Sequence, residues 1–311
     1  MNFTETTLKV LAATENGMIK SNAQFWQKFS DKEIFDREVI VDSEDILKTK
    51  EKLQSLFSGS NELGMICAFD SSFPKINSNV KNNSEKPYLL FYYGDISLLE
   101  DLNNNVAVIG LTDPDEEVKT REISVVKEIV KNRMTIVSGL AKGCDSIAHR
   151  ISVEEKGKTI AILPSPLSNI FPAENRDLAQ KIIDTGGLLV TEYLNDPKSR
   201  FEAIDRFVKR DRLQAMFSKA IILIASYRKG EGDSGSRHAM LSAKKYKIDR
   251  YALYDKKIDE QDTRFGLNKD LINNDKVKVL KVKSIIEISN LKNPNISVFK
   301  NSKSAEQLTI L

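Results

Sequence analysis

The stretch MTIVSGLAKGCDSIAH, residues 134–149, constrains the fold of this chain more than any other part of its sequence. It begins as a short apolar strand, continues through a turn of small residues, and then starts a helix. Gly139 and Gly143 let the backbone turn tightly and let a ligand approach it closely. A helix that starts after such a turn presents N–H groups and a positive dipole end, and Lys142 adds a positive charge. The pattern predicts a phosphate site; the alternative is a tight strand-to-helix connection with an exposed lysine.

Short apolar strands alternate with helices from residue 63 onward. Alternation at this spacing predicts an α/β fold with a doubly wound, mostly parallel sheet of the Rossmann type. Ligands of such sheets bind beyond the carboxyl ends of the strands, so the glycine turn lies where a ligand is expected. The expected strands are 63–69, 87–94, 106–110, 135–139, 158–164, 188–193, 220–226 and 250–254, and the expected helices are 116–132 and those starting near 145, 175 and 236.

Two other regions flank this alternating part of the chain. Residues 1–60 contain TLKVLAAT, NAQFWQKF and EDILKTKEKLQSLF, which place apolar residues three and four positions apart and predict a small N-terminal helical unit. We expect Phe25 and Trp26 to pack this unit onto the following domain, residues 61–290. Residues 291–311 are rich in Asn, Ser and Lys and are expected to form a flexible tail.

Composition narrows the class of protein. Hydrophobic residues make up 41% and charged residues 29% of the 311 residues, as in ordinary soluble proteins, and a net charge of +3 does not identify a nucleic-acid-binding protein. Cys67 and Cys144 lack metal-ligand spacing, which favours a reducing compartment. With only His149 and His238, a multi-histidine metal centre is excluded. We see no signal peptide and no membrane span, and therefore expect a cytoplasmic protein.

Positive charge concentrates in KSRFEAIDRFVKRDR, residues 198–212, where six basic residues stand against three acids. Basic residues with interleaved aromatic side chains are typical of proteins that bind single-stranded nucleic acids. The alternative is a solvated helix face. For Phe201 and Phe207 we favour a place in the hydrophobic core.

The candidates for catalysis are weak. Asp145 and His149 are four residues apart and share a helix face, but no serine or cysteine nucleophile with a matching base accompanies them. We therefore favour a structural pairing of Asp145 with His149, a packed thiol for Cys144, and no enzymatic activity. Glu192 could hold a ribose hydroxyl, but an ion pair with a nearby arginine is favoured. The G-x-G-x-x-G fingerprint is absent after residues 106–110, so no NAD or other cofactor is expected.

Several motifs occur in one order: SSFP with KPYLLFYYGDISLL, VAVIG, VSGLAKGCDSIAH, GKTIAIL with IFPAEN, GGLLVTEY, FVKRDR, SGS and GLNKDLI. In this order, over residues 63–272, the sequence resembles the DNA-processing protein A (DprA/Smf) family. The resemblance implies an extended Rossmann-like fold and a protein that binds single-stranded DNA and hands it to a RecA-type recombinase during natural transformation. It also implies a homodimer, and it implies no nucleotide hydrolysis.

The resemblance also implies a DNA-phosphate site made of the glycine turn, the paired arginines of KRDR and the later Ser-Gly-Ser turn. Asp211 stands where the family has an asparagine between the two arginines. Asn268 in GLNKDLI is expected to pin a loop through its side-chain amide. The residues expected at the phosphate site are Ser138, Gly139, Lys142, Gly143, Arg210, Arg212, Ser234, Gly235, Ser236 and Arg237.

The sequence departs from the family after the first parallel strand. Where the family has Gly-Ser-Arg, with the arginine contacting DNA, this chain has Gly-Leu-Thr at 110–112, followed by Asp113, Asp115, Glu116 and Glu117. These acids suit a helix N-terminus, and they place negative charge where a phosphate would otherwise bind. The main hypothesis is therefore a divergent, non-catalytic single-stranded-DNA-binding protein. The alternatives are a nucleotide-derivative sensor or hydrolase on the same fold, and an interaction scaffold whose phosphate sites have decayed.

Overall fold

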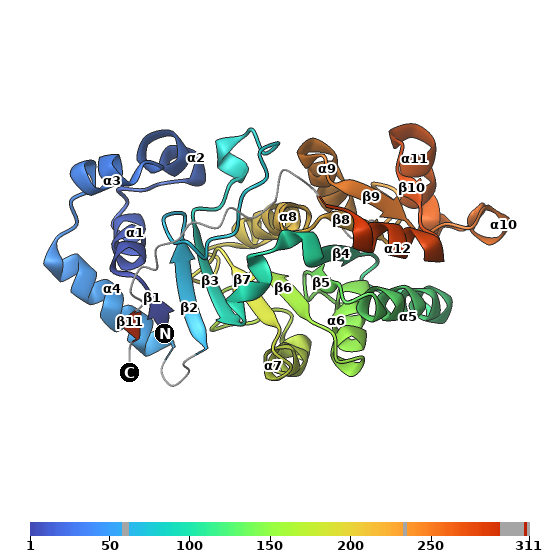
Figure 1. The fold of residues 1–311 in the computed structure, drawn as a ribbon, viewed down its shortest axis with the longest axis horizontal. Coiled ribbons are helices and arrows are strands. Elements are labelled where there is room, and N and C mark those ends of the chain that lie inside the picture. Colours follow the sequence, from blue (N-terminus) through green and yellow to red (C-terminus); the bar gives the residue numbers. More distant parts are fainter. Residues whose placement is uncertain (58–61, 233–234, 293–307, 310–311) are drawn as a thin grey trace.

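The computed structural model describes residues 1–57, 62–232, 235–292 and 308–309, and within these ranges eleven strands form one sheet. The parallel part has the order β10-β9-β8-β4-β5-β6-β7 (Figure 1). Because the strand order reverses between β4 and β8, the loops after these strands meet at a topological switch point. The parallel strands are β4 (Asn105–Ile109), β5 (Thr135–Ser138), β6 (Thr159–Leu163), β7 (Leu188–Thr191), β8 (Ala220–Leu223), β9 (Asp249–Ala252) and β10 (Lys278–Val279).

Four further strands extend the sheet beyond β7. β3 (Leu89–Gly94) pairs antiparallel with both β7 and β2 (Leu63–Cys67), β1 (Asn2–Phe3) is parallel to β2, and β11 (Leu308–Thr309) is antiparallel to β1. Since two antiparallel steps restore the direction, β2 ends at the same edge of the sheet as β7. The prediction of an α/β, mostly parallel, Rossmann-like sheet is confirmed.

Helices cover both faces of the parallel part because its strand residues alternate between two hydrophobic layers. Val106 and Val108 pack in the layer with the helices α5 and α6, whereas Ala107 and Ile109 pack in the layer with α8 and α9. Figure 1 shows the two groups of helices on different sides of the sheet. The helices of the core are α5 (Glu116–Lys131), α6 (Cys144–Glu154), α7 (Arg176–Asp184), α8 (Arg200–Met216), α9 (Ser236–Tyr246), α10 (Lys256–Asp259), α11 (Gly266–Asp275) and α12 (Val282–Asn290).

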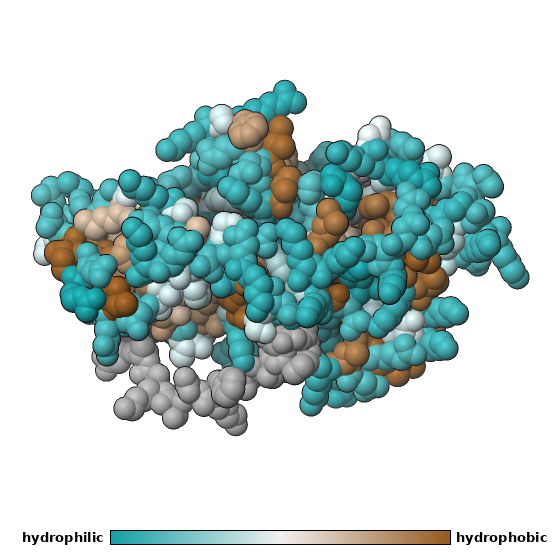
Figure 2. Space-filling view, turned by 90° about the horizontal axis from the view of Figure 1, so that it is seen from above, coloured by the Kyte–Doolittle hydropathy of each residue, from teal (hydrophilic) through white to brown (hydrophobic). Residues whose placement is uncertain are grey.

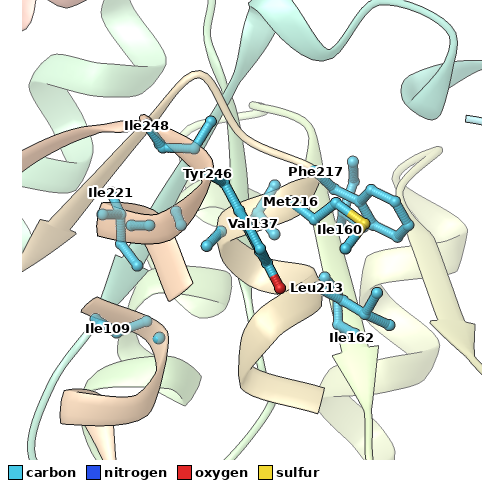
Figure 3. Close-up of a cluster of buried hydrophobic side chains, with 14 of the residues drawn as sticks. Ile109, Val137, Ile160, Ile162, Leu213, Met216, Phe217, Ile221, Tyr246 and Ile248 are labelled. Carbon is cyan, nitrogen blue, oxygen red and sulfur yellow. The ribbon is translucent and has the colours of Figure 1, made fainter. Parts of the chain in front are cut away.

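The layer beneath α8 and α9 is close-packed around Tyr246. Figure 3 shows Leu213, Met216 and Phe217 meeting the strand residues Val137 and Ile160 within one cluster. All of these side chains are at most 1% exposed. Burying a side chain of this size stabilises the folded state by roughly 1.5–3 kcal/mol. This layer therefore fixes α8 on the sheet, and with it the arginines that α8 carries.

The N-terminal region is mostly helical, as expected. Phe25 is buried and its ring stacks on Tyr88 at a centroid distance of 4.6 Å, while Nε1 of Trp26 donates to the carbonyl of Lys86 at 3.0 Å. These contacts confirm that the two aromatic residues pack the helices onto the next segment. The elements are α1 (Glu5–Glu15), α2 (Asn22–Gln24), a π-helical turn (Phe25–Phe29), α3 (Lys32–Glu38) and α4 (Ser43–Leu56).

The domain boundaries at residues 60 and 290 stay predictions. β1 belongs to the same sheet as the core, and side chains of α1 share a hydrophobic cluster with β2 and β3. Most of the predicted tail, residues 291–311, lies outside the described residues.

Two local predictions are confirmed. Asp115 caps α5, since its carboxylate accepts the N–H of Val118 at 3.0 Å. Asn268 is fully buried and pins the loops after β8 and β9, because it accepts from the N–H of Ser226 and donates to the carbonyl of Leu253. Within the described ranges, no helix is both long and apolar enough to cross a membrane. Figure 2 shows a mainly hydrophilic face on which hydrophobic residues form separate patches.

Candidate functional site

The three segments predicted to form a phosphate site meet at the carboxyl edge of the sheet. They surround a small cavity of about 30 Å³, which is large enough to hold a water molecule. Ser234 lies outside the described residues. The cavity is lined by Ile109, Gly110, Thr112, Ala141, Lys142, Asp145, Arg210, Asp211, Gln214 and Ser236.

Both glycines of the turn are required by close contacts. A Cβ atom on Gly139 would lie 1.0 Å from Nη1 of Arg210, so only glycine lets the guanidinium lie across the turn. Gly143 has a φ of +71°, and a Cβ atom there would lie 2.3 Å from the carbonyl oxygen of Leu111. The turn therefore brings the loop after β4, the start of α6 and the middle of α8 together.

The N–H groups of the turn already bind an anion, which is the carboxylate of Asp145. Its Oδ2 accepts from the N–H of Gly139 at 3.1 Å and from that of Ala141 at 3.4 Å, and the N–H of Cys144 donates to Leu111. A phosphate at these N–H groups would have to replace Asp145. Sequence reasoning missed this role, although an acid two residues after the second glycine, in the first helical turn, was its signal.

Arg210 is buried between two acids. Its Nη1 lies 3.4 Å from Oδ2 of Asp145, and its Nε lies 3.4 Å from Oδ1 of Asp211. Burial raises the pKa of Asp211 to about 7; the charge of Arg210 opposes this and that of Asp145 adds to it. A single cation therefore faces two carboxylates, one of which titrates near neutral pH.

Arg212 is also buried and fully engaged within the protein. Its Nη1 and Nη2 donate to Glu192 at 2.8 and 2.7 Å, and its Nε donates to the carbonyl of Glu85 at 2.7 Å. The interpretation that Glu192 holds an arginine is confirmed. Such bidentate pairs are geometrically specific, so Arg212 joins β7, α8 and the segment before β3.

Lys142 is the cation of the turn, and its side chain is exposed. Its Nζ lies 2.5 Å from Oε2 of Glu174, and the two side chains are 59% and 53% exposed. Exposed ion pairs contribute roughly 0–1 kcal/mol, so a phosphate can compete with Glu174 for this lysine.

The two described serines of the site donate hydrogen bonds to backbone carbonyl groups at the end of β4. Ser138 is fully buried and its Oγ donates to the carbonyl of Val108, while Oγ of Ser236 donates to the carbonyl of Gly110. Gly235, with a φ of +83°, is the residue before α9. Arg237 follows in the first turn of α9, half-buried beside His238.

Asp145 and His149 do not pair with each other. Nδ1 of His149 lies 2.7 Å from Oγ1 of Thr159 inside the protein, and burial lowers the pKa of this imidazole to about 3. Cys144 is buried, and desolvation raises the pKa of its thiol well above the ordinary value. The predicted structural pairing of Asp145 with His149 is therefore wrong, because each side chain has other partners: Asp145 accepts the N–H groups of the turn, and His149 contacts Thr159. The burial of Cys144 agrees with a packed thiol. In the described part of the chain, no group of three or more metal-binding side chains could hold an ion.

The prediction that Phe201 lies in the core is wrong. Phe201 is 82% exposed in the first turn of α8, and Phe207 is half-buried with its ring edge-to-face against Phe171 at 5.9 Å. The reason is that α8 turns Arg206 and Arg210 inward, where acids and carbonyl groups of other elements accept them. The opposite face of the helix is therefore left to apolar residues.

A family model described as DNA recombination-mediator protein A matches residues 64–290. Protein Smf of Borreliella burgdorferi is 31% identical over 151 residues, which are 47% of this chain and 45% of that protein. DNA processing protein DprA of Bacillus subtilis is 29% identical over 157 residues, or 50% of each chain. The matched segment spans about half the length of these curated relatives.

Two solved structures share the fold. DNA processing protein A from Streptococcus pneumoniae superposes with a TM-score of 0.69 at 22% identity, covering 92% of this chain and 98% of that one. DNA processing protein A from Helicobacter pylori, described for its single-stranded DNA binding mode, superposes with a TM-score of 0.59 at 25% identity, covering 73% and 94%.

Proposed function

Because this chain belongs to the DNA recombination-mediator protein A family, we propose that it binds single-stranded DNA and catalyses no reaction on it. The observation that carries the proposal is the meeting of the glycine turn, the KRDR segment of α8 and the start of α9 at the carboxyl edge of the sheet. The Helicobacter pylori relative, described as binding single-stranded DNA, shares this fold over 73% of the chain.

The chemistry of the edge favours phosphates over bases. Lysine side chains, helix N-termini and backbone N–H groups bind phosphate oxygens, which carry no sequence information. We therefore expect binding that depends little on base sequence and strongly on salt.

A closed nucleotide site at the glycine turn is the weaker candidate. Small-molecule sites usually enclose about 300–1,000 Å³, whereas the cavity at this turn measures about 30 Å³. The buried cations beside it already have carboxylate partners.

Family membership supports three finer proposals. We propose that the protein acts in the cytoplasm in DNA uptake and recombination, that a RecA-type recombinase receives the DNA, and that the working form is a homodimer.

The proposal is tested by fluorescence anisotropy with a labelled oligo-dT at several salt concentrations. Wild type should bind, and log K should fall with log salt by about 0.7 per phosphate contacted. Lys142→Ala should flatten that slope by about 0.7, because the lysine is exposed at the edge. Lys127→Ala is the matched control, since Lys127 is 53% exposed and also paired with a glutamate.

Absence of binding by wild type at low salt would overturn the proposed function. Equal slopes for wild type and Lys142→Ala would show instead that the phosphates bind elsewhere on the molecule.

A further inference from the structure

Carboxylates of the protein itself neutralise most of the positive charge near the glycine turn. Arg210 faces Asp145 and Asp211, and Arg212 is held by both oxygens of Glu192. A strand of DNA needs several accessible cations along its backbone. Lys142 alone does not provide them, so other cations must line the path.

The helix α8, which contributes Arg210 to the glycine turn, also lines a much larger groove. Figure 1 shows α1 and α2 on one side of the molecule and α8 and α9 nearer its centre; residues of both groups line a groove of about 780 Å³. We call it the N-terminal groove, and define it by Lys20, Asn22, Glu192, Val208, Leu241 and Lys245. Its floor holds the pair of Glu192 and Arg212, and Asn22 reaches Glu192 from the N-terminal side at 3.3 Å.

The groove has an excess of positive charge. Six lysine and arginine side chains line it, against three carboxylates. Arg206 and Arg212 are buried in ion pairs, so the accessible cations are the lysines at 20, 209, 244 and 245.

Lys244 and Lys245 are 56% and 64% exposed, and they pair with Asp275 and Glu85, whose side chains are 16% and 21% exposed. Asp275 also pairs with Arg250, and Glu85 also accepts the hydroxyl of Tyr246, so both acids keep a partner when a phosphate takes the lysine. Lys20 is exposed on the opposite wall.

Apolar side chains stand between these lysines. Val208 of α8 and Leu241 of α9 are 40% and 41% exposed, and both line the groove. Cations along a channel, with apolar surface between them, accommodate the phosphates and the base faces of a single strand.

We propose that single-stranded DNA runs through the N-terminal groove, with phosphates at Lys20, Lys244 and Lys245. The N-terminal helices then form one wall of the DNA path, which gives this region a role in binding. The inference rests on the proposed function, because it names where the same ligand lies.

The experiment compares two variants that each lose three positive charges. The groove variant is Lys20→Ala/Lys244→Ala/Lys245→Ala. The control variant is Lys48→Ala/Lys127→Ala/Lys131→Ala, which also changes one N-terminal lysine and two lysines of the core, all exposed. Anisotropy with labelled oligo-dT is measured between 50 and 200 mM salt. Melting temperatures confirm that both variants are folded.

We expect the groove variant to bind at least tenfold more weakly than wild type at 50 mM salt. The slope of log K against log salt should be flatter by about 2 for this variant. Over this fourfold change in salt, the affinity of wild type should therefore fall by a factor about 16 times larger than that of the variant. The control variant should keep the wild-type slope. Oligonucleotides carrying 4-thiothymidine should photocrosslink to the segment around Lys20 and to α9.

The inference is overturned if the groove variant matches wild type or the control variant in affinity and slope; the groove would then be open to an acidic protein segment instead. Crosslinks confined to the glycine turn would overturn it as well. If wild type itself fails to bind at 50 mM salt, the proposed function fails first, which distinguishes the two failures.

Discussion

At the residue scale, the carboxylate of Asp145 takes the place that a phosphate was expected to occupy. It accepts the N–H groups of Gly139 and Ala141 and lies 3.4 Å from Nη1 of Arg210. Turn N–H groups at the start of a helix favour an anion, and here a side chain of that same helix supplies it. DNA phosphates at this turn must therefore compete with an intramolecular carboxylate.

Asp211 gives a prediction about pH. Its pKa of about 7 means that it is mostly neutral at pH 6 and mostly ionised at pH 8, beside Asp145 and Arg210. Ionisation adds a negative charge near the phosphates, so wild-type affinity for oligo-dT should fall as pH rises through 7. At ~10 Å and water-like screening the effect is about 0.4 kcal/mol, or roughly twofold.

The measurement is anisotropy at pH 6, 7 and 8 for wild type and Asp211→Asn. Because the amide of the variant cannot ionise, its affinity for oligo-dT should stay constant between pH 6 and pH 8. A variant that keeps the full wild-type pH dependence would assign the titration to another group.

Among the elements, α8 is a helix in which three of four arginines face inward and an apolar stripe faces outward. Arg206, Arg210 and Arg212 are at most 7% exposed, whereas Phe201 and Ile204 are 82% and 56% exposed. Charged side chains stay buried when other elements pair them, as α6 does for Arg210 and the segment after β7 does for Arg212.

This orientation predicts very different effects of two substitutions in α8 on the free energy of unfolding. Leu213→Ala removes a side chain that is 1% exposed and should cost about 2–5 kcal/mol of the free energy of unfolding. Phe201→Ala removes one that is 82% exposed and should change that free energy by less than about 0.5 kcal/mol. Urea denaturation followed by circular dichroism measures both. A large loss for Phe201→Ala would mean that this face of α8 is covered.

At the scale of the whole molecule, one sheet runs from the Rossmann-like part into the N-terminal region. β1 pairs with β2, and Leu8 and Leu11 of α1 share a hydrophobic cluster with Met65 and Phe91. The N-terminal region therefore covers apolar side chains of β2 and β3 as well as forming one wall of the groove.

Deletion of residues 1–60 tests the predicted boundary. If these residues are a separable unit, residues 61–311 should still melt in one cooperative transition. We expect that transition at a lower temperature than in the full chain, because Met65 and Phe91, at most 1% exposed in the intact protein, lose part of their cover. Thermal melting by circular dichroism and calorimetry measures this. An aggregated or unfolded product would place the boundary elsewhere.

Local sequence patterns were sufficient to predict most of the secondary structure. Apolar runs and helical periodicity predicted the parallel strands and most helices, because the residues that one element buries recur with the period of that element. The sequence also predicted the helix cap at Asp115 and the tight turn at Gly139, since caps and turns depend on residues close in sequence. The family motifs then predicted which three segments would meet.

The pairing of the buried charges, in contrast, depends on how distant segments pack together. Arg210 and Asp145 are 65 residues apart in sequence, and Arg212 and Glu192 are 20 apart, so no local pattern predicts the geometry of these pairs. The exposure of Phe201 follows from the burial of Arg206 and Arg210, which lie on the opposite face of α8. The N-terminal groove is likewise formed by elements distant in sequence, and its excess charge exists only once they pack together.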